Sequence, residues 1–336
     1  MGAVAVADEI AALLRGANIL SSSEKAQGEP LAGGVSSDIW RIDTAEGPVC
    51  VKRALAKLKV AADWYAPVER NANEVAWIET AGRIVPGAVP RILAHDPAVG
   101  AFAMEFLDPA RYRSWKEDLR RGIADAAVAA AVGDALGRIH AGTADDPAIA
   151  ARFSTDAIFH AIRLDPYLLA TAGVHPRVTD PLRAIADETA RTKRVLVHGD
   201  VSPKNIVVGP KGPVFLDAEC AWFGDPAFDL AFCLNHFLLK CLWAPSAKEA
   251  FLACFAAMTA AYLNRVAWEP PADLEARTAR LLPGLFLARV DGKSPVEYVT
   301  DAGDKMRVRR VAGMLLEDPV RKLSTVSAAW RKELEE

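Results

Sequence analysis

The sequence predicts an α+β protein, with a small antiparallel sheet in its first third and a larger, mostly helical remainder. Short apolar runs separated by turn-forming residues occupy positions 31–52, and a further apolar run follows at 102–107; both are typical of strands. From residue 122 onward, most segments repeat apolar residues at helical spacing. One strand–turn–strand pattern, at residues 195–217, interrupts the helical part and carries the clearest functional signal.

The composition is that of a globular protein with a substantial core. Apolar residues make up 51% and charged residues 25% of the 336 positions, and the net charge of −3 gives no general attraction for nucleic acid or anionic membranes. Five cysteines without a C-x-x-C pair favour a reducing compartment, and we expect neither a signal peptide nor a membrane span. We therefore expect a soluble, cytoplasmic protein that acts on a small molecule, without nucleic acid or membrane, and we leave a homodimer open.

The first third is predicted in the order helix, hairpin, helix, strand. Residues 4–20 have a helical composition that ends at a run of serines, and the apolar runs 35–42 and 48–52 are joined by a turn at 44–47. A helix is expected over residues 68–83 and a strand over 102–107. In the remainder, helices are expected at residues 122–140, 227–242, 250–266, 276–288 and 300–316, whereas residues 153–172 contain no pattern that predicts an element.

Residues 194–230 combine a hairpin pattern with polar residues at fixed spacing. A buried strand at 195–197 leads into His198-Gly199-Asp200, and Asn205 follows five residues after the aspartate. The apolar runs 206–208 and 213–216 flank a turn at 209–212, and the second run leads directly into Asp217. This pattern predicts a tight hairpin that carries Asp200, Asn205 and Asp217 at one end of its strands. Two carboxylates and an amide are oxygen donors of the kind that magnesium-dependent phosphoryl transfer requires.

The joint pattern of H-x-D-x-x-x-x-N, hairpin and strand-terminal aspartate resembles the catalytic core of the protein-kinase-like superfamily. The His-Gly-Asp motif and the segment GDPAFDL at 224–230 are similar to those of the aminoglycoside phosphotransferase and choline kinase family, whose members phosphorylate small molecules. The resemblance implies a bilobal protein-kinase-like fold, with an N-terminal lobe at 1–107 that covers the nucleotide. The C-terminal lobe at 108–336 would then hold the catalytic hairpin 195–217 and the substrate pocket.

The same resemblance implies roles for the three polar residues of the hairpin. Asp200 would accept the proton from, or orient, a substrate hydroxyl, and Asn205 and Asp217 would hold Mg²⁺. ATP would donate its γ-phosphate to the hydroxyl of a small metabolite. Ala218-Glu219 stands where protein kinases have Phe-Gly after the metal-binding aspartate, which fits the small-molecule branch.

Nucleotide-binding residues are implied in the first lobe. Gly33, Gly34 and Ser36 belong to a turn whose backbone N–H groups could approach ATP oxygens, although no Walker A motif is present. Lys52, at the end of an apolar strand, matches the lysine that holds the α- and β-phosphates, and Lys57 is the alternative.

The lysine is expected to pair with a glutamate of the helix at 68–83. Glu74, near the middle of this helix, is the expected partner, and Glu69 and Glu79 remain competitors. The adenine base is expected to bond with the backbone of the strand end at residues Glu105, Phe106 and Leu107.

Several nearby polar residues are expected to support the site. His198 is expected to order the loop by hydrogen bonding, and Asp225 and Asp229 to brace the catalytic loop and cap the next helix. His140, near the end of a helix, is interpreted as a capping or packing residue, and the role of Glu219 stays open between support of the site and contact with a cationic substrate.

The acceptor is not predicted by the sequence. Sugars, amino alcohols, hydroxylated amino acids and aminoglycoside-like compounds stay open, although residues 110–190 and the segment after 240 contain no acidic cluster larger than a pair, as a cationic substrate would require. Polar or aromatic candidates for substrate contact are Trp115, Lys116, Arg163 and Arg289.

The sequence disfavours three alternatives to a small-molecule kinase. A metal-dependent hydrolase built on the same carboxylates is disfavoured by the spacing of the hairpin. A nucleotide-binding pseudokinase with a regulatory or scaffolding role would be expected to lack at least one of Lys52, Asp200, Asn205 and Asp217, and all four are present. A protein kinase would need an activation segment after Asp217, and the segment up to residue 231 leaves no room for one.

Overall fold

The computed structural model describes residues 4–31, 37–55, 68 and 70–336. The chain divides into two compact units. The N-terminal unit comprises Met1–Tyr112 together with Leu216–Glu219, and the C-terminal unit comprises Arg113–Phe215 and Cys220–Glu336. Asp217 thus belongs to the N-terminal unit, although it directly follows a hairpin of the C-terminal unit. The division into lobes at residue 107 stays a prediction.

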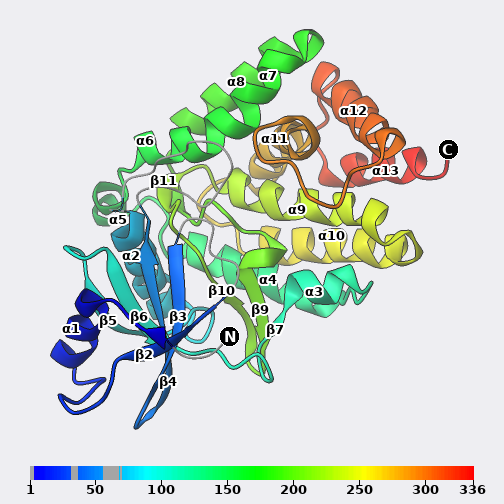
Figure 1. Ribbon diagram of the computed structural model, residues 1–336. Helices are drawn as coiled ribbons and strands as arrows, with labels where there is room; N and C mark the ends of the chain where they lie inside the picture. Colours follow the sequence, from blue (N-terminus) through cyan, green and yellow to red (C-terminus); the bar gives the residue numbers. More distant parts are fainter. Residues whose placement is uncertain (1–3, 32–36, 56–67, 69) are drawn as a thin grey trace. The chain divides into compact units, whose positions relative to one another are not determined.

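The N-terminal unit is built on an antiparallel sheet, shown in Figure 1. Its strands lie in the order β1-β2-β3-β4-β6-β5. Their bounds are β1 (Val4–Ala5), β2 (Gln27–Pro30), β3 (Ser37–Thr44), β4 (Gly47–Ala54), β5 (Ile92–Asp96) and β6 (Ala101–Glu105). Because successive side chains of a strand point to opposite faces, Val49 and Val51 of β4 lie on one face of the sheet and Lys52 lies on the other.

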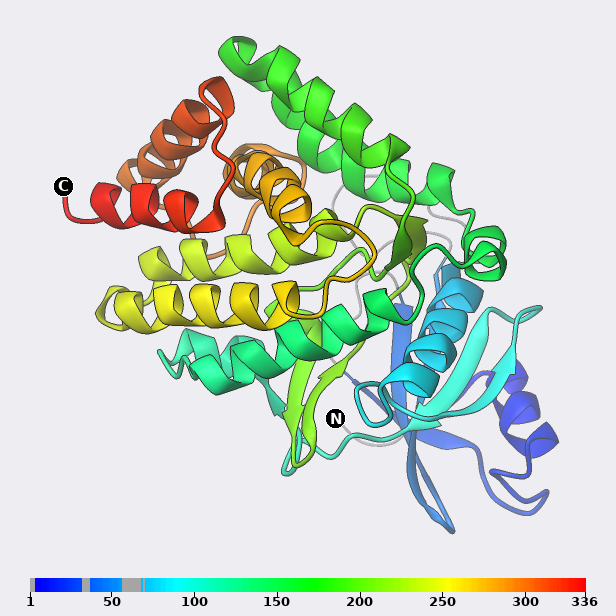
Figure 2. The same ribbon diagram turned by 180° about the vertical axis from the view of Figure 1, so that it is seen from behind.

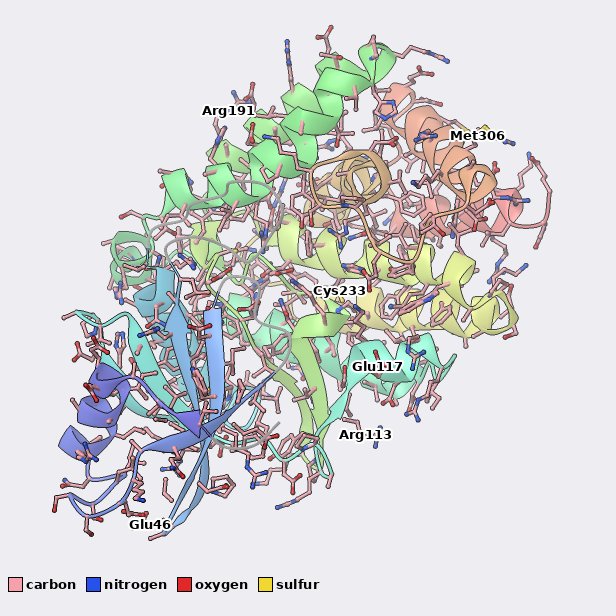
Figure 3. The ribbon with its side chains drawn as sticks, viewed as in Figure 1. Glu46, Arg113, Glu117, Arg191, Cys233 and Met306 are labelled. Atoms are coloured by element: carbon pink, nitrogen blue, oxygen red, sulfur yellow. The ribbon has the colours of Figure 1, made fainter. Side chains whose placement is uncertain are left out.

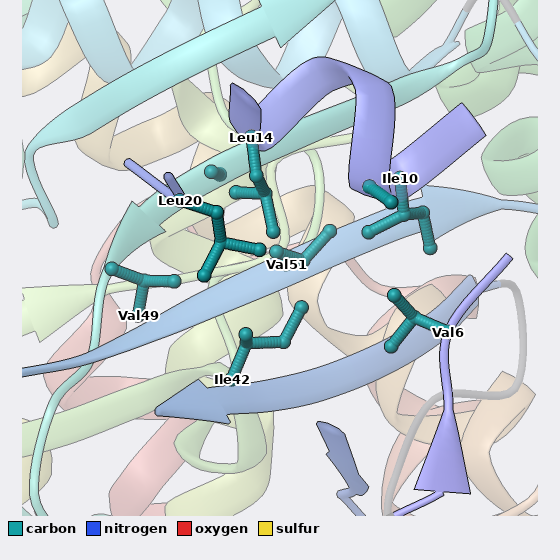
Figure 4. Packing of buried hydrophobic residues seen from close by; sticks show 9 residues of the cluster. Val6, Ile10, Leu14, Leu20, Ile42, Val49 and Val51 are labelled. Atoms are coloured by element: carbon teal, nitrogen blue, oxygen red, sulfur yellow. The ribbon is translucent and has the colours of Figure 1, made fainter. Parts of the chain in front are cut away.

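The two faces of this sheet contact different helices. Ile10 and Leu14 of α1 (Asp8–Gly16) share a buried cluster with Val49 and Val51, as Figure 4 shows. On the other face, α2 (Arg70–Ile84) contacts Lys52. Apolar side chains therefore stabilise one face of the sheet, and the charged side chain of Lys52 is buried on the other.

The helix predicted over residues 4–20 is wrong in its extent. Val4 and Ala5 form β1, which pairs with β2, and the helix covers only Asp8–Gly16. Asp8 and Glu9 lie in its first turn, where carboxylates favour a helix N-terminus. Beyond its last turn, Asn18 adopts a left-handed φ of 57°, which prevents the helix from continuing.

The C-terminal unit is mostly helical. Its helices are α3 (Trp115–Arg120), α4 (Ala126–Ala141), α5 (Pro147–Arg152), α6 (Asp156–Phe159), the π-helical η1 (His160–Leu169), α7 (Ala170–Val174), η2 (Pro176–Val178), α8 (Thr179–Arg191), η3 (Pro203–Asn205), α9 (Pro226–Trp243), η4 (Pro245–Ala247), α10 (Lys248–Leu263), α11 (Pro271–Asp291), α12 (Ala302–Glu317) and α13 (Leu323–Glu333). Its strands are β7 (Arg113–Ser114), β8 (Val195–Val197), β9 (Ile206–Gly209), β10 (Gly212–Phe215) and β11 (Trp222–Gly224). The predicted fold class, an antiparallel sheet with a mostly helical remainder, is confirmed.

Helix α9 lies at the centre of the C-terminal unit, against α10 and α11, and α10 in turn packs on α4 (Figure 2). Nearly every residue of α9 is buried, including Cys233, which Figure 3 labels. The crossing of α4 and α10 is close at Gly133, where a Cβ atom would lie 2.5 Å from the carbonyl oxygen of Met258. No described helix has the length and apolar character needed to cross a bilayer.

Two small antiparallel pairings hold the polar loop of the C-terminal unit. Strands β9 and β10 form the hairpin predicted at residues 206–216, with Gly209 opposite Gly212. Strand β8 pairs with β11, which sequence analysis did not predict. The segment between β8 and β9, residues 198–205, is hereafter called the catalytic loop.

Candidate active site

In the N-terminal unit, Lys52 lies between two carboxylates. Its Nζ atom donates to both carboxylate oxygens of Glu74, at 2.9 and 2.7 Å, and to Oδ1 of Asp217 at 2.5 Å. Lys52 is 4% exposed and Glu74 is 2% exposed, whereas the Asp217 side chain retains 28%. The ammonium group is therefore fixed, and Asp217 is the member of the cluster that solvent reaches.

Burial and charge act in opposite directions on this cluster. Burial alone would lower the pKa of Lys52, but the carboxylates of Asp217, Glu74 and Glu219 raise it well above its ordinary value. Burial raises the pKa of Glu74 to about 7, and the Lys52 ammonium limits that rise. The lysine therefore stays charged over the whole physiological range.

Asp217 has an unusual backbone conformation. Its φ of 67° lies in the left-handed region, which is costly for residues other than glycine and often marks a functional position. Two residues later, Glu219 accepts from Nε of Arg70 at 3.0 Å, and Arg70 also donates to the carbonyl oxygen of Leu55 at 2.7 Å. Glu219 thus pairs with a buried arginine of α2, a contact that sequence analysis left open.

In the C-terminal unit, Asp229 of α9 holds the start of the catalytic loop. Its carboxylate, which is fully buried, accepts from the backbone N–H groups of His198 at 2.7 Å and Gly199 at 2.8 Å. His140 Nε2 lies 3.3 Å from the same carboxylate, and its Nδ1 lies 2.7 Å from the hydroxyl of Tyr262. His140 is therefore a buried link behind the loop rather than a helix cap, an arrangement that its position in the sequence did not indicate.

The conformation of the loop depends on Gly199 and His198. Gly199 has a φ of 81°, and a Cβ atom at this position would lie 2.7 Å from the carbonyl oxygen of Cys220. The backbone N–H of Asp200 donates to Nδ1 of His198 at 3.1 Å. Both residues orient the backbone at Asp200.

Asp200 is buried between two cations. One of its carboxylate oxygens lies 3.0 Å from Arg163 and 3.2 Å from Lys204. Burial alone would raise the pKa of Asp200, but Lys204, Arg163 and His198 together lower it well below its usual range. The carboxylate is therefore ionised at neutral pH. Arg163 also donates to the carbonyl oxygen of Gly199, so that it holds the loop and its aspartate at once.

Asn205 presents its amide oxygen. Its Nδ2 donates to the backbone oxygen of Asp200 at 3.1 Å, which leaves Oδ1 as an acceptor. Mg²⁺ is bound in proteins by one or two carboxylates or other hard oxygens together with substrate phosphates and water. The amide oxygen of Asn205 and the solvent-accessible carboxylate of Asp217 are each donors of this kind, and their role toward Mg²⁺ stays a prediction. No cluster of three or more His, Cys, Asp or Glu that could hold a metal by itself occurs among the described residues.

The structure describes only some of the other residues that were predicted to bind the nucleotide. Gly33, Gly34 and Ser36 lie outside the described residues. Phe106 and Leu107 follow β6 and form no backbone hydrogen bond with any described residue, whereas Glu105 N donates to the carbonyl oxygen of Arg91 at 2.9 Å. Their roles toward the adenine stay predictions.

The structure distinguishes the competitors of Glu74 and the candidate substrate contacts. Glu79 is exposed, and Glu69 lies outside the described residues. Trp115 is 2% exposed and packs edge-to-face on Phe237, so that it belongs to the core and is not available to a substrate. Sequence analysis proposed Arg163 as a substrate contact and missed its pairing with Asp200, since 37 residues and a π-helix separate the two in the chain.

Comparison with known proteins identifies the family. The sequence model of a phosphotransferase enzyme family matches residues 27–283, which is more than half of the chain. The chain belongs to this family. The family recognised from the catalytic loop and the hairpin is therefore confirmed.

Solved structures share the fold of this chain. An amicoumacin kinase in complex with AMP-PNP and Ca²⁺ is 15% identical, with a TM-score of 0.54 over 95% of this chain and 98% of that one. A choline kinase from Cryptosporidium parvum is 10% identical, with a TM-score of 0.51 over 98% and 96% of the two chains. At these identities the likeness shows the shared fold alone. No curated protein sequence matched the chain.

Proposed function

We propose that the protein is an ATP- and Mg²⁺-dependent kinase that transfers the γ-phosphate to a hydroxyl group of a small metabolite. The observation that carries this proposal is the cluster of Lys52, Glu74 and Asp217. Burying three charged groups together costs free energy, and such clusters are often found where a ligand binds. A lysine flanked by two carboxylates is also the arrangement expected of a lysine that binds phosphate. A pseudokinase would be expected to lack at least one of Lys52, Asp200, Asn205 and Asp217, and all four are present.

In this proposal Asp200 acts on the acceptor hydroxyl. The carboxylate is ionised and is held by Arg163 and Lys204, so it accepts the hydroxyl hydrogen bond in a fixed orientation. Because phosphoryl transfer passes through a loose transition state, positioning contributes more than the strength of the base. A base of this kind contributes roughly 10²–10⁴-fold to the rate.

Asn205 and Asp217 would hold the metal ion, and Lys52 would hold the α- and β-phosphates of ATP. Bound Mg²⁺ offsets the negative charge of the phosphate oxygens as the γ-phosphate leaves. The Lys52 ammonium, positioned by Glu74, would contribute a second positive charge, and the N–H that it donates to Asp217 would turn to the phosphates when the nucleotide binds. The backbone groups of Phe106 and Leu107 provide hydrogen-bonding capacity for the adenine edge.

Two variants test the two halves of the proposal. Asp200→Asn removes the charge that orients the hydroxyl, so we expect loss of transfer with nucleotide affinity retained. Asp217→Ala removes a metal ligand, so we expect loss of the Mg²⁺-dependent part of ATP binding, measured by titration calorimetry with and without MgCl₂. Asp145→Asn, at an exposed position paired only with Arg194, is the control and should change neither quantity.

The readout is a metabolite extract incubated with labelled ATP and MgCl₂, in which the labelled product is identified. Near-normal transfer by Asp200→Asn would refute the role of this aspartate, and unchanged ATP affinity of Asp217→Ala would refute the metal site. If the protein binds ATP and Mg²⁺ but transfers label to no metabolite, it is a nucleotide-binding pseudokinase.

A further inference from the structure

One face of α9 runs from the catalytic loop to the far end of the C-terminal unit. Asp229, Phe232, His236, Lys240 and Trp243 are spaced three or four residues apart and therefore lie along one side of the helix. The first of them holds the catalytic loop by two hydrogen bonds. Residues further along this stripe therefore lie on the same rigid element as the support of Asp200.

Ring contacts connect the stripe to Asp200. The guanidinium of Arg163, which pairs with Asp200, lies 5.8 Å from the ring of Phe232 and 5.8 Å from that of Tyr167. Arg289 of α11 lies 5.7 Å from the same tyrosine ring and donates to its hydroxyl at 3.3 Å. Phe232 is thus separated from Asp200 by the side chain of Arg163, and Arg289 by those of Tyr167 and Arg163.

Lys240 is a buried cation without a carboxylate partner. It is 1% exposed, and its Nζ lies 4.3 Å from the ring centre of Trp243 and 5.0 Å from that of Tyr298, two rings that stack at 4.2 Å. No described carboxylate lies within ion-pair distance of it. Burial, and then the nearby Lys116, lower the pKa of Lys240 to about 7.

The acidic groups that act on Lys240 from a distance already have partners. Glu297 pairs with Lys116 at 2.5 Å, and Glu117, which Figure 3 labels on α3, pairs with Arg120 at 2.7 Å. Both glutamates are more than half exposed, so that solvent screens their effect on the buried ammonium. Neither of them satisfies Lys240.

Three polar atoms in the surroundings of His236 and Tyr298 are buried without a hydrogen-bond partner in the described part of the chain. They are Nε2 of His236, Nε of Arg289 and the hydroxyl of Tyr298. Burial, then Arg289, Lys240, Lys204 and Lys116, lower the pKa of His236 well below its ordinary value, so that the ring is neutral. A buried polar atom that lacks a partner is costly, and a group of them beside an unpaired cation indicates a missing ligand.

We propose that His236, Lys240, Arg289 and Tyr298, hereafter the basic face, bind an anionic group of the acceptor. The acceptor would then be a hydroxylated carboxylate or a phosphate ester, not an amine. This inference rests on the proposed kinase function and specifies its substrate class. An anion would neutralise Lys240 and accept hydrogen bonds from the remaining donors, whereas a cationic acceptor would face Lys240 and Arg289 as like charges.

The first test asks which charge class of metabolite accepts phosphate. A cell extract is separated by ion exchange into anionic, neutral and cationic pools, and each pool receives the protein, labelled ATP and MgCl₂, with Asp200→Asn as the blank. We expect transfer from the anionic pool. Treatment of that pool with alkaline phosphatase beforehand distinguishes the two sources, since carboxylates survive the treatment and phosphate monoesters do not.

The outcomes separate this inference from the proposed function. Transfer confined to the neutral or the cationic pool overturns the anionic acceptor and leaves the kinase intact. Absence of transfer from every pool overturns the kinase function, and the inference falls with it.

The second test measures what Lys240 contributes. With the accepted metabolite, Lys240→Met should raise the KM for the acceptor at least 30-fold, which corresponds to about 2 kcal/mol, with kcat and the KM for ATP little changed. Lys240→Arg should retain most of the affinity because it keeps the charge, and His236→Gln gives an independent variant that should raise the same KM. Lys332→Met, the same replacement at an exposed position of α13, is the control. An unchanged acceptor KM in both Lys240→Met and His236→Gln would refute the role of the basic face.

Discussion

The buried charge of Lys240 has a consequence for stability that needs no substrate to measure. The ammonium is 1% exposed and has no carboxylate partner among the described residues, so the folded protein disfavours its charged form. Replacement by methionine keeps a side chain of similar length beside Trp243 and removes the charge. We therefore expect Lys240→Met to be more stable to unfolding than the natural protein at pH 7 and below.

The size of the effect follows from the two pKa values. Lys240 has its ordinary pKa of 10.5 in the unfolded chain and a pKa of about 7 in the folded protein. Between pH 7 and pH 10.5 the unfolded chain binds more protons at Lys240 than the folded protein does, so the free energy of unfolding of the natural protein rises with pH. The variant has no titrating group at this position, and its free energy of unfolding does not change with pH for this reason. At 1.36 kcal/mol per pKa unit, the stability advantage of the variant should shrink by about 2 kcal/mol between pH 7 and pH 9.

The assay is urea unfolding, followed by circular dichroism, of the natural protein and the variant at pH 6, 7, 8 and 9. Other groups that titrate in this range, such as Glu74 with its pKa of about 7, are common to both proteins and cancel in the difference. Lys332→Met should show no pH-dependent difference over this range. Parallel pH profiles for the natural protein and Lys240→Met would show that Lys240 is solvated or paired, and would refute the reasoning about its burial.

Three further predictions concern the candidate active site. Asp229→Asn leaves one of the two backbone N–H groups of the catalytic loop without its carboxylate acceptor. The variant should therefore lower the free energy of unfolding by about 2–3 kcal/mol and reduce phosphate transfer. A loss below 0.5 kcal/mol in urea unfolding would contradict the role of Asp229 in holding the loop. Gly199→Ala should lower the free energy of unfolding by about 2 kcal/mol or more, because its φ is 81° and the added Cβ atom would meet a backbone oxygen. Gly173→Ala, where the Cβ atom would have open space, is the control and should not lower the free energy of unfolding measurably in the same assay. Glu74→Gln should weaken ATP binding roughly 10–100-fold in calorimetry, because the Lys52 ammonium loses the carboxylate that orients it. Glu79→Gln, on the exposed side of α2, is the control and should bind ATP as tightly as the natural protein. If both glutamine variants bound ATP with equal affinity, Glu74 would have no role in nucleotide binding.

Local spacing made much of the candidate site predictable. Asp200, Asn205 and Asp217 lie within 18 residues of one another, and a hairpin of fixed register connects them, so their order along the chain carries geometric information. The family resemblance, together with the order of strand and helix, predicted Glu74 as the partner of Lys52. The exclusion of Glu79 needed the structure, because it depends on which side of α2 meets the sheet.

Long-range partners were not predictable. Arg163 reaches Asp200 from a π-helical segment that contains a proline, and neither strand nor helix periodicity describes such a segment. His140 gave no signal of its contact with Asp229, since a histidine near a helix end is compatible with capping, packing or catalysis. Lys240 lies near the end of an apolar helix, where a lysine usually reaches solvent, and its burial depends on packing by Trp243 and Tyr298.

The position of Lys240 on α9 also limits the size of the acceptor. At 1.5 Å of rise per residue, His236 lies about 10 Å and Lys240 about 16 Å along the helix from Asp229, the residue that holds the catalytic loop. Phe232, which contacts Arg163, lies between Asp229 and His236 on the same stripe, so the anionic group and the reacting hydroxyl are not adjacent. A hydroxy acid of three carbons is too short to reach from Asp200 to Lys240. The accepted metabolite should therefore separate its hydroxyl from its anionic group by several bonds more, and a screen restricted to the smallest hydroxy acids would miss it.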